Sequence, residues 1–409
     1  MSAHASPHRR RGITTTAVVT FIEEYCLLVP LGAAIALVWA NTGSESYYTV
    51  AHRWSFAVNE IGMALFFGLL TQEVVDAVMP GGALHTWRKW VLPAIAAGGG
   101  VAGSALVYRT YVALKYESVL ALGWPAATAV DLAFAYFVAR IIFRGHPASA
   151  FLLLVALATN LFGLIIVTLR YPIHDWFPSG PGGAALVLAA IALAALLRRW
   201  KVRSFIPYLA VCGTLSWWGL YLDGLHPAVA LIPIVPFLPH AARQIDLFTD
   251  RDAGHRSPRH AEHLWNYGVQ VVLFLFGLVN AGVVTTGYGT ATWAVLTAAM
   301  VGRPVGILAA FAGARAVGFH APAGFHRRDL VVVALAASCS FTFGLFFATA
   351  IYPPGAILGE LKMGAFATGA GTIAALLAAR GLGVGRFTHH RGSPHLKKHD
   401  HEHLQHARA

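Results

Sequence analysis

Long apolar runs, separated by short polar stretches, recur along most of this chain. A helix needs roughly 20 apolar residues to cross a bilayer, and most of the runs reach about that length. They fall at roughly 24–41, 57–78, 90–111, 120–143, 148–170, 182–197, 204–222, 226–239, 264–285, 289–315, 328–352 and 357–380. The eighth run is unusually short. The pattern predicts an all-α membrane protein with about twelve transmembrane helices.

The composition agrees with this pattern, because 57% of the residues are hydrophobic and only 12% are charged. The formal net charge of +12 comes from connections between the apolar runs. Basic residues concentrate in alternate connections, as the positive-inside rule requires when both termini are cytoplasmic. Examples are Arg88, Arg144, Arg198, Arg243 and Arg327 on the predicted inner side, against Arg53, Lys115 and Arg170 on the outer side. We therefore expect a lipid membrane around the protein and no nucleic-acid partner.

Three regions follow from the polarity of the sequence. Residues 1–20 are predicted to be a cytoplasmic tail, 21–385 the membrane domain, and 386–409 a disordered, histidine-rich cytoplasmic tail. No phosphate-binding loop, nucleophile elbow or paired-cysteine motif is present in the sequence. The sequence therefore indicates neither an enzyme nor a resident metal or cofactor.

Asp131 lies inside the fourth apolar run, within GWPAATAVDLAFAYFVARIIFR (123–144). A carboxylate at membrane depth is costly, so such a residue normally marks a functional site. Gly123 and Pro125 precede it and disfavour a continuous helix. In the second half of the chain, the segment 340–344 (SFTFG) interrupts the eleventh run in a comparable place. Two interrupted spans in corresponding places indicate a transporter site between inverted repeats, although kinks that merely pack against neighbouring helices give the same pattern.

Eight stretches, in order along the chain, resemble the NhaA family of sodium/proton antiporters. They are FFGLLTQEVVDAV (66–78), RKWVLPAIAAGGGVAGSALVY (88–108), GWPAATAVDLAFA (123–135), ALATNLFGLI (156–165), DGLHPAVA (223–230), LFGLVNAGVV (275–284), VGRPVGI (301–307) and SFTFGLFFA (340–348). The resemblance implies inverted repeats with broken, crossing fourth and eleventh helices. It also implies a secondary transporter in the bacterial inner membrane that exchanges protons for Na⁺ or Li⁺, and a homodimer.

The resemblance also assigns the site residues. Asp131 takes the place of the family aspartate of the fourth helix, as carrier of the proton and the cation. Arg303 replaces the family lysine that compensates the helix dipoles. Thr159 and Asn160 stand where the family has two adjacent aspartates, and with Asp131 form the expected cation site. Supporting positions are Glu73, Thr342 and Asn280.

The replacements leave other functions open. Neither Thr159 nor Asn160 ionises, and the guanidinium of Arg303 stays protonated. One carboxylate then faces one arginine, which weakens a cation site of the usual kind. The alternatives are a divergent carrier for another solute, such as an anion attracted by Arg303, and a non-transporting pH or ion sensor with the histidine-rich tail as its output.

Overall fold

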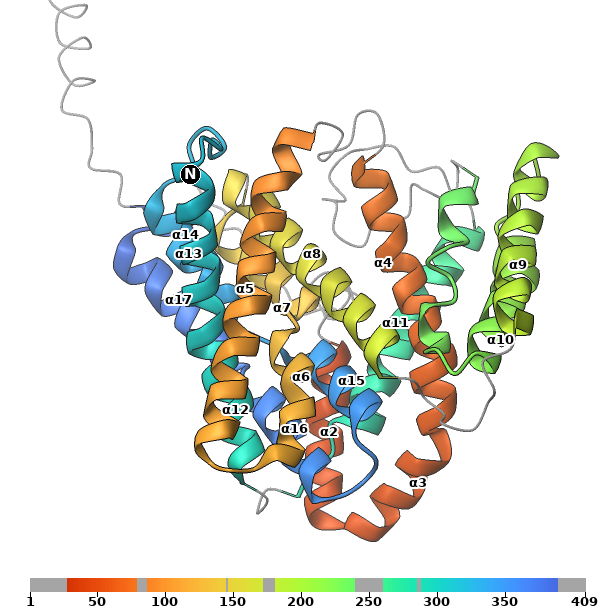
Figure 1. The fold of residues 1–409 in the computed structure, drawn as a ribbon, viewed down its shortest axis with the longest axis horizontal. Helices are drawn as coiled ribbons and strands as arrows, with labels where there is room; N and C mark the ends of the chain where they lie inside the picture. The colour runs from red at the N-terminus through yellow and green to blue at the C-terminus, as the bar shows by residue number, and fades with distance from the viewer. Residues whose placement is uncertain are drawn as a thin grey trace, which may run out of the picture.

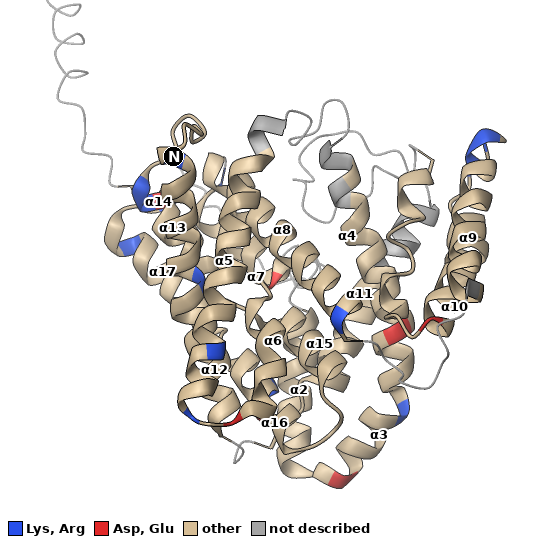
Figure 2. Ribbon diagram, viewed as in Figure 1, with Lys and Arg blue, Asp and Glu red and all other residues tan. Residues whose placement is uncertain are grey.

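The computed structural model describes residues 28–78, 87–144, 146–171, 181–239, 260–284 and 288–388. Within these ranges every regular element is a helix or a helical turn, which confirms the predicted all-α class. The helices pack side by side as a bundle, with α6, α7 and α15 near its centre (Figure 1). Charged residues of the described part lie mostly near helix ends, as expected for spans with apolar middles (Figure 2).

Six helical stretches in the described residues are long and apolar enough to cross a membrane, and eight are if two bent pairs are each taken as one span. The six stretches are Ser44–Gln72, Trp90–Leu114, Pro147–Arg170, Gly182–Arg199, Thr290–Ala316 and Ala356–Phe387. Their elements are α3 (Ser44–Phe56), η1 (Ala57–Gly62), α4 (Met63–Val78), α5 (Trp87–Leu114), α8 (Pro147–Arg170), α9 (Pro181–Arg199), α12 (Thr290–Thr297), η7 (Ala298–Gly302), α13 (Arg303–Ala316), α16 (Ala356–Ala367), α17 (Ala370–Leu382) and η8 (Gly385–Phe387).

Four other predicted runs form elements outside these six stretches. The first corresponds to α2 (Leu28–Thr42) and the ninth to α11 (His260–Asn280), while the seventh contains η3 (Tyr208–Gly213) and α10 (Thr214–Leu222). The predicted eighth run holds only the 3₁₀ turns η4 (Pro227–Val229) and η5 (Val235–Phe237). Prolines at 227, 233, 236 and 239 remove the backbone donors that a continuous helix needs. That run is therefore a series of tight turns, and a full set of twelve helices remains a prediction.

The α5 and α13 helices approach each other closely through glycines. A Cβ atom on Gly103 would collide with the carbonyl oxygen of Gly302, and one on Gly306 would collide with that of Gly99. This contact lets two spans pack with their backbones almost touching, as small residues allow in membranes. It also brings Arg303, the first residue of α13, into the centre of the bundle.

Candidate functional site at the crossing of two broken helices

Two spans are interrupted in the middle. In the first, η2 (Ser118–Gly123) and α6 (Trp124–Thr128) are followed after three residues by α7 (Leu132–Ile142), with a bend of 40°. In the second, α14 (Arg327–Ala336) is followed after four residues by α15 (Phe341–Ile351), with a bend of 45°. The α6 and α15 halves lie side by side in the centre of the bundle (Figure 1).

The two interruptions meet each other through their backbones. The N–H of Asp131 donates a hydrogen bond to the carbonyl oxygen of Cys339 at 2.8 Å. The second interruption covers residues 337–340, whereas 341–344 form the first turn of α15. The sequence-based position of this break, 340–344, is therefore wrong by a few residues.

Asp131 caps the N-termini of both half-helices that begin at the crossing. Its Oδ1 accepts a hydrogen bond from the N–H of Phe134 in α7 at 3.0 Å, and its Oδ2 accepts one from the N–H of Thr342 in α15 at 2.6 Å. The side chain is fully buried. The carboxylate therefore lies where the partial positive charges of two helix ends converge.

Arg303 donates hydrogen bonds to the C-termini of the other two half-helices at the crossing. Its Nη1 donates to the carbonyl oxygen of Ala337, at the end of α14, at 2.6 Å, and its Nη2 donates to that of Ala127 in α6. Arg303 is also fully buried. Gly100 of α5 faces its side-chain stem, since a Cβ there would lie 3.2 Å from Arg303 Cγ.

These four contacts balance the charges of the crossing. A helix end carries about half an elementary charge, so two N-termini amount to about +1 and two C-termini to about −1. Asp131 offsets the first pair and Arg303 the second. The crossing is thus close to neutral as it stands, and any change in the charge of Asp131 leaves two helix ends without compensation.

Asn160 and Thr159, both buried in α8, differ in their contacts. The Oδ1 of Asn160 accepts from the N–H of Val130 at 3.0 Å, and its Nδ2 donates to the carbonyl oxygen of Val130 at 2.8 Å. Asn160 thus replaces both backbone bonds that Val130 would make in a continuous helix. The hydroxyl of Thr159 instead donates to Val155 in its own helix at 2.7 Å. Its oxygen keeps lone pairs that can accept further bonds.

Ser340, beside the crossing, fixes the second interruption in place. Its N–H donates to the Oγ1 of Thr368 at 2.8 Å, and its own hydroxyl donates to the carbonyl oxygen of Ala126 at 2.9 Å. Thr368 follows the last residue of α16, so a third span takes part in holding the break. Sequence reasoning did not single out these two bonds, because their partners lie far away along the chain.

Two predicted supporting residues lie outside the crossing. Asn280, at the end of α11, exchanges hydrogen bonds with Asn59 of η1 at 2.7 and 3.2 Å, which connects the two helices. Glu73 lies within α4, but its side chain is outside the described residues.

Glu60 is an acidic residue that sequence reasoning missed. It is the neighbour of Asn59 in the π-helical turn η1, an element often found at functional sites. Its Oε2 lies 3.2 Å from Nδ1 of His226, and both side chains are largely buried. The His226 ring also lies 5.4 Å from that of Phe346, one helical turn beyond Thr342 on α15. His226 therefore contacts a carboxylate inside the bundle, and Glu60 is a second carboxylate within a helical stretch long enough to span the membrane.

Comparison with known proteins agrees with this architecture. The family model described as Na⁺/H⁺ antiporter 1 matches residues 22–382. The chain is 40% identical to Na⁺/H⁺ antiporter NhaA 1 of Pelobacter propionicus, with 90% of this chain and 99% of the relative covered. It is 38% identical to Na⁺/H⁺ antiporter NhaA of Geobacter sulfurreducens, with the same coverage.

Among solved structures, the chain resembles the sodium proton antiporter MjNhaP1 from Methanocaldococcus jannaschii at pH 8. The TM-score is 0.56 at 15% identity, with 90% of this chain and 96% of that chain covered, so the likeness concerns the fold. The family match and the two relatives together extend over nearly the whole membrane part of the sequence. The chain is a member of the Na⁺/H⁺ antiporter 1 family of multi-pass membrane proteins.

Proposed function

We propose that this protein is a secondary transporter that exchanges protons for a monovalent cation, Na⁺ or Li⁺, with Asp131 as the group that carries the proton. The observation that supports this role most strongly is the position of Asp131. A fully buried carboxylate is held at the meeting point of two broken spans by hydrogen bonds to both. The names of the relatives, all sodium/proton antiporters, point to the same exchange.

Competition for one carboxylate gives the exchange its coupling. A proton and a cation both neutralise the charge of Asp131, so the carboxylate holds one or the other. Either ligand weakens the hydrogen bonds that Asp131 accepts from α7 and α15, because both bonds depend on its negative charge. Binding of a proton or a cation therefore changes how firmly Asp131 holds α7 and α15. In this way binding can favour the conformation that is open to one side of the membrane or the other.

The neighbouring α8 residues then have separate proposed roles. Thr159 offers a hydroxyl oxygen as a cation ligand, while its O–H donates a hydrogen bond to the carbonyl oxygen of Val155. Asn160 acts as a positioning residue, because both ends of its amide are engaged with Val130, directly before Asp131. Its carbonyl oxygen reaches a cation only if the crossing moves. The cation site therefore depends on rearrangement of the segment 129–131.

An anion carrier based on Arg303 has less support. Both terminal nitrogens of the guanidinium are engaged with backbone carbonyls of Ala127 and Ala337. An anion at this position would have to displace helix ends from the arginine. The sensor alternative rests on the histidine-rich tail, whose residues 389–409 lie outside the described residues.

The membrane arrangement belongs to the same proposal. Both termini lie in the cytoplasm, as the distribution of Lys and Arg indicates. The protein works in a bacterial inner membrane as a homodimer with a membrane domain of about twelve spans over 21–385, between the tails 1–20 and 386–409. The first residues of the second tail, 386 and 387, belong to η8.

The proposal is tested by proton flux in vesicles that contain the purified protein. Addition of Na⁺ or Li⁺ should release protons from wild-type vesicles, and Asp131→Asn should abolish the release. Asp329→Asn is the matched control, since Asp329 is another buried carboxylate that caps a helix, at the start of α14. Wild-type vesicles that release no protons with either ion would overturn the proposed exchange.

A further inference from the structure

A hollow of about 430 Å³ lies at the end of the last span, away from the crossing. It is lined by Arg380 in the last turn of α17, Arg386 and Phe387 in η8, and Thr388. The apolar stretch Ala356–Phe387 ends here, so the hollow lies at the level where the span leaves the membrane.

The backbone around the hollow is held in a fixed shape. Gly383 and Gly385 have φ angles of +62° and +60°, which favour glycine and turn the chain back after α17. A Cβ atom on Gly385 would collide with the carbonyl oxygen of Ile142, so η8 rests directly on the end of α7. The backbone of the hollow is thus fixed by its packing against α7.

The charge of the hollow is positive and is not neutralised from within the described chain. Arg380 and Arg386 are exposed and make no hydrogen bond or ion pair with a described residue, and the Arg386 guanidinium lies 5.1 Å from the centre of the Phe387 ring. Arg328 of α14 donates to the carbonyl oxygen of Leu382 at 3.5 Å, which adds a third guanidinium nearby. Basic residues cluster around the ends of α14 and α17 (Figure 2).

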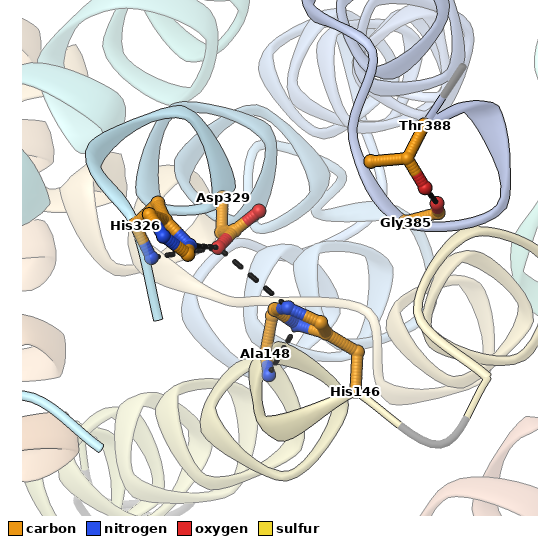
Figure 3. A network of polar contacts seen from close by, with 6 residues as sticks. All are labelled: His146, Ala148, His326, Asp329, Gly385 and Thr388. Atoms are coloured by element: carbon orange, nitrogen blue, oxygen red, sulfur yellow. Dashed lines mark hydrogen bonds and ion pairs between the residues drawn. The ribbon is translucent and has the colours of Figure 1, made fainter. Parts of the chain in front are cut away.

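The carboxylate of Asp329, on the same end of α14, is engaged elsewhere. Its Oδ2 accepts from the N–H of His326 at 2.7 Å and lies 3.6 and 3.9 Å from ring nitrogens of His326 and His146 (Figure 3). Asp329 thus caps the start of α14 and lies next to two histidines. Within the described residues, no carboxylate pairs with Arg380 or Arg386, so their guanidiniums can bind an external anion.

An exposed apolar face of α17 leads to the hollow. Ile373 and Leu377 are 61% and 66% exposed, and they precede Arg380 by seven and three residues. At these spacings the three side chains lie on one face of the helix. This face is apolar along the span and carries a cation at its end. A phospholipid has the matching arrangement, because its acyl chains lie in the membrane and its phosphate lies at the surface.

We infer that this hollow, lined by Arg380 and Arg386, binds the phosphate of an anionic phospholipid, with the acyl chains against Ile373 and Leu377. A guanidinium binds phosphate oxygens in a bidentate way, and two of them in one hollow hold a headgroup more firmly than scattered surface charges do. Because α7, α14 and α17 meet here, the bound lipid connects halves of both broken spans with the last span.

The test measures lipid binding to the purified full-length protein in a neutral detergent, by native mass spectrometry. Dioleoyl phosphatidylglycerol is titrated against the wild type and against Arg380→Gln/Arg386→Gln. The matched control is Arg53→Gln/Arg109→Gln, which removes two exposed arginines from other places. Dioleoyl phosphatidylcholine and inorganic phosphate are titrated in parallel.

We expect the Arg380/Arg386 variant to bind phosphatidylglycerol about tenfold more weakly or worse, and the control variant to bind it like the wild type. Phosphatidylcholine should bind the wild type more weakly than phosphatidylglycerol. Unchanged phosphatidylglycerol affinity in the Arg380/Arg386 variant, or an equal loss in the control, would overturn the site. Displacement of the lipid by millimolar inorganic phosphate would assign the hollow to a free anion and overturn the lipid assignment.

Discussion

Asp131 and Arg303 divide the four helix ends of the crossing between them, the carboxylate bonding to two N-termini and the guanidinium to two C-termini. Each charge is therefore held by two different spans at once. This explains how an aspartate and an arginine can both be fully buried inside a bundle of apolar helices, because each has a partner of opposite partial charge on two sides. It also makes the crossing sensitive to the charge of either residue.

Removal of the arginine charge should destabilise the protein strongly. We expect Arg303→Met to lower the free energy of unfolding by about 3 kcal/mol, since the carbonyl ends at Ala127 and Ala337 lose their counter-charge. Arg303→Lys should lose less, because it keeps the charge but not the two-pronged geometry. Thermal unfolding in detergent measures both, and equal melting temperatures for wild type and Arg303→Met would contradict the assigned role.

Asn160 and Thr159 should respond differently to the same substitution. Asn160→Ala leaves the N–H and the carbonyl oxygen of Val130 without partners, which should cost about 2–4 kcal/mol of stability. Thr159→Ala removes a hydroxyl that bonds only within its own helix, and should cost about 1 kcal/mol or less. The two variants can be compared by thermal unfolding. A larger loss for Thr159→Ala than for Asn160→Ala would be incompatible with the proposed positioning role of Asn160.

The breaks and Asp131 could be predicted from the sequence, because Asp131 is the only acidic residue in its apolar run, whereas Arg303 was assigned through the resemblance to the family. The exact place of the second break could not, since it depends on distant partners. Cys339 accepts from Asp131, and Ser340 is fixed by Thr368 of another span. The segment 341–344 (FTFG), which belonged to the predicted interruption 340–344, forms an ordinary first helical turn.

The contact that Glu60 makes is a second feature that could not be predicted from the sequence. It lies near the edge of its predicted apolar run, where a carboxylate is inexpensive, so its sequence position drew no attention. Its partner His226 is 166 residues away, and only the fold brings the two together. The residue types Asn160 and Thr159 could be read from the sequence as replacements for aspartates, but the engagement of Asn160 with Val130 could not.

Glu60 and His226 should be energetically coupled, because their side chains are in direct contact and largely buried. A double-mutant cycle with Glu60→Gln and His226→Asn should give a coupling of about 1 kcal/mol or more. Stability curves of the four proteins provide the measurement. Additive losses of stability in the double variant would count against a direct interaction between the two side chains.

The glycine contact between α5 and α13 should tolerate no added side chain. Gly103→Ala places a Cβ against the backbone of Gly302 and should lower the melting temperature by several degrees, consistent with a loss of about 1–3 kcal/mol. Gly313→Ala, in the same α13 helix, is the control, because no atom lies within 4 Å of its added Cβ. The control should be neutral or slightly stabilising, since alanine favours helix more than glycine does. Equal effects of the two substitutions would show that the close approach is not required.

The central claim, that Asp131 alone carries the proton, is tested most directly by the effect of membrane potential on exchange. One carboxylate carries about one proton per cycle, so exchange with a singly charged cation moves no net charge. Vesicles containing the wild-type protein should therefore show the same Na⁺-driven proton flux with and without an imposed potential, and Asp131→Asn should show none. An exchange driven by the potential, or one that survives in Asp131→Asn, would contradict the account.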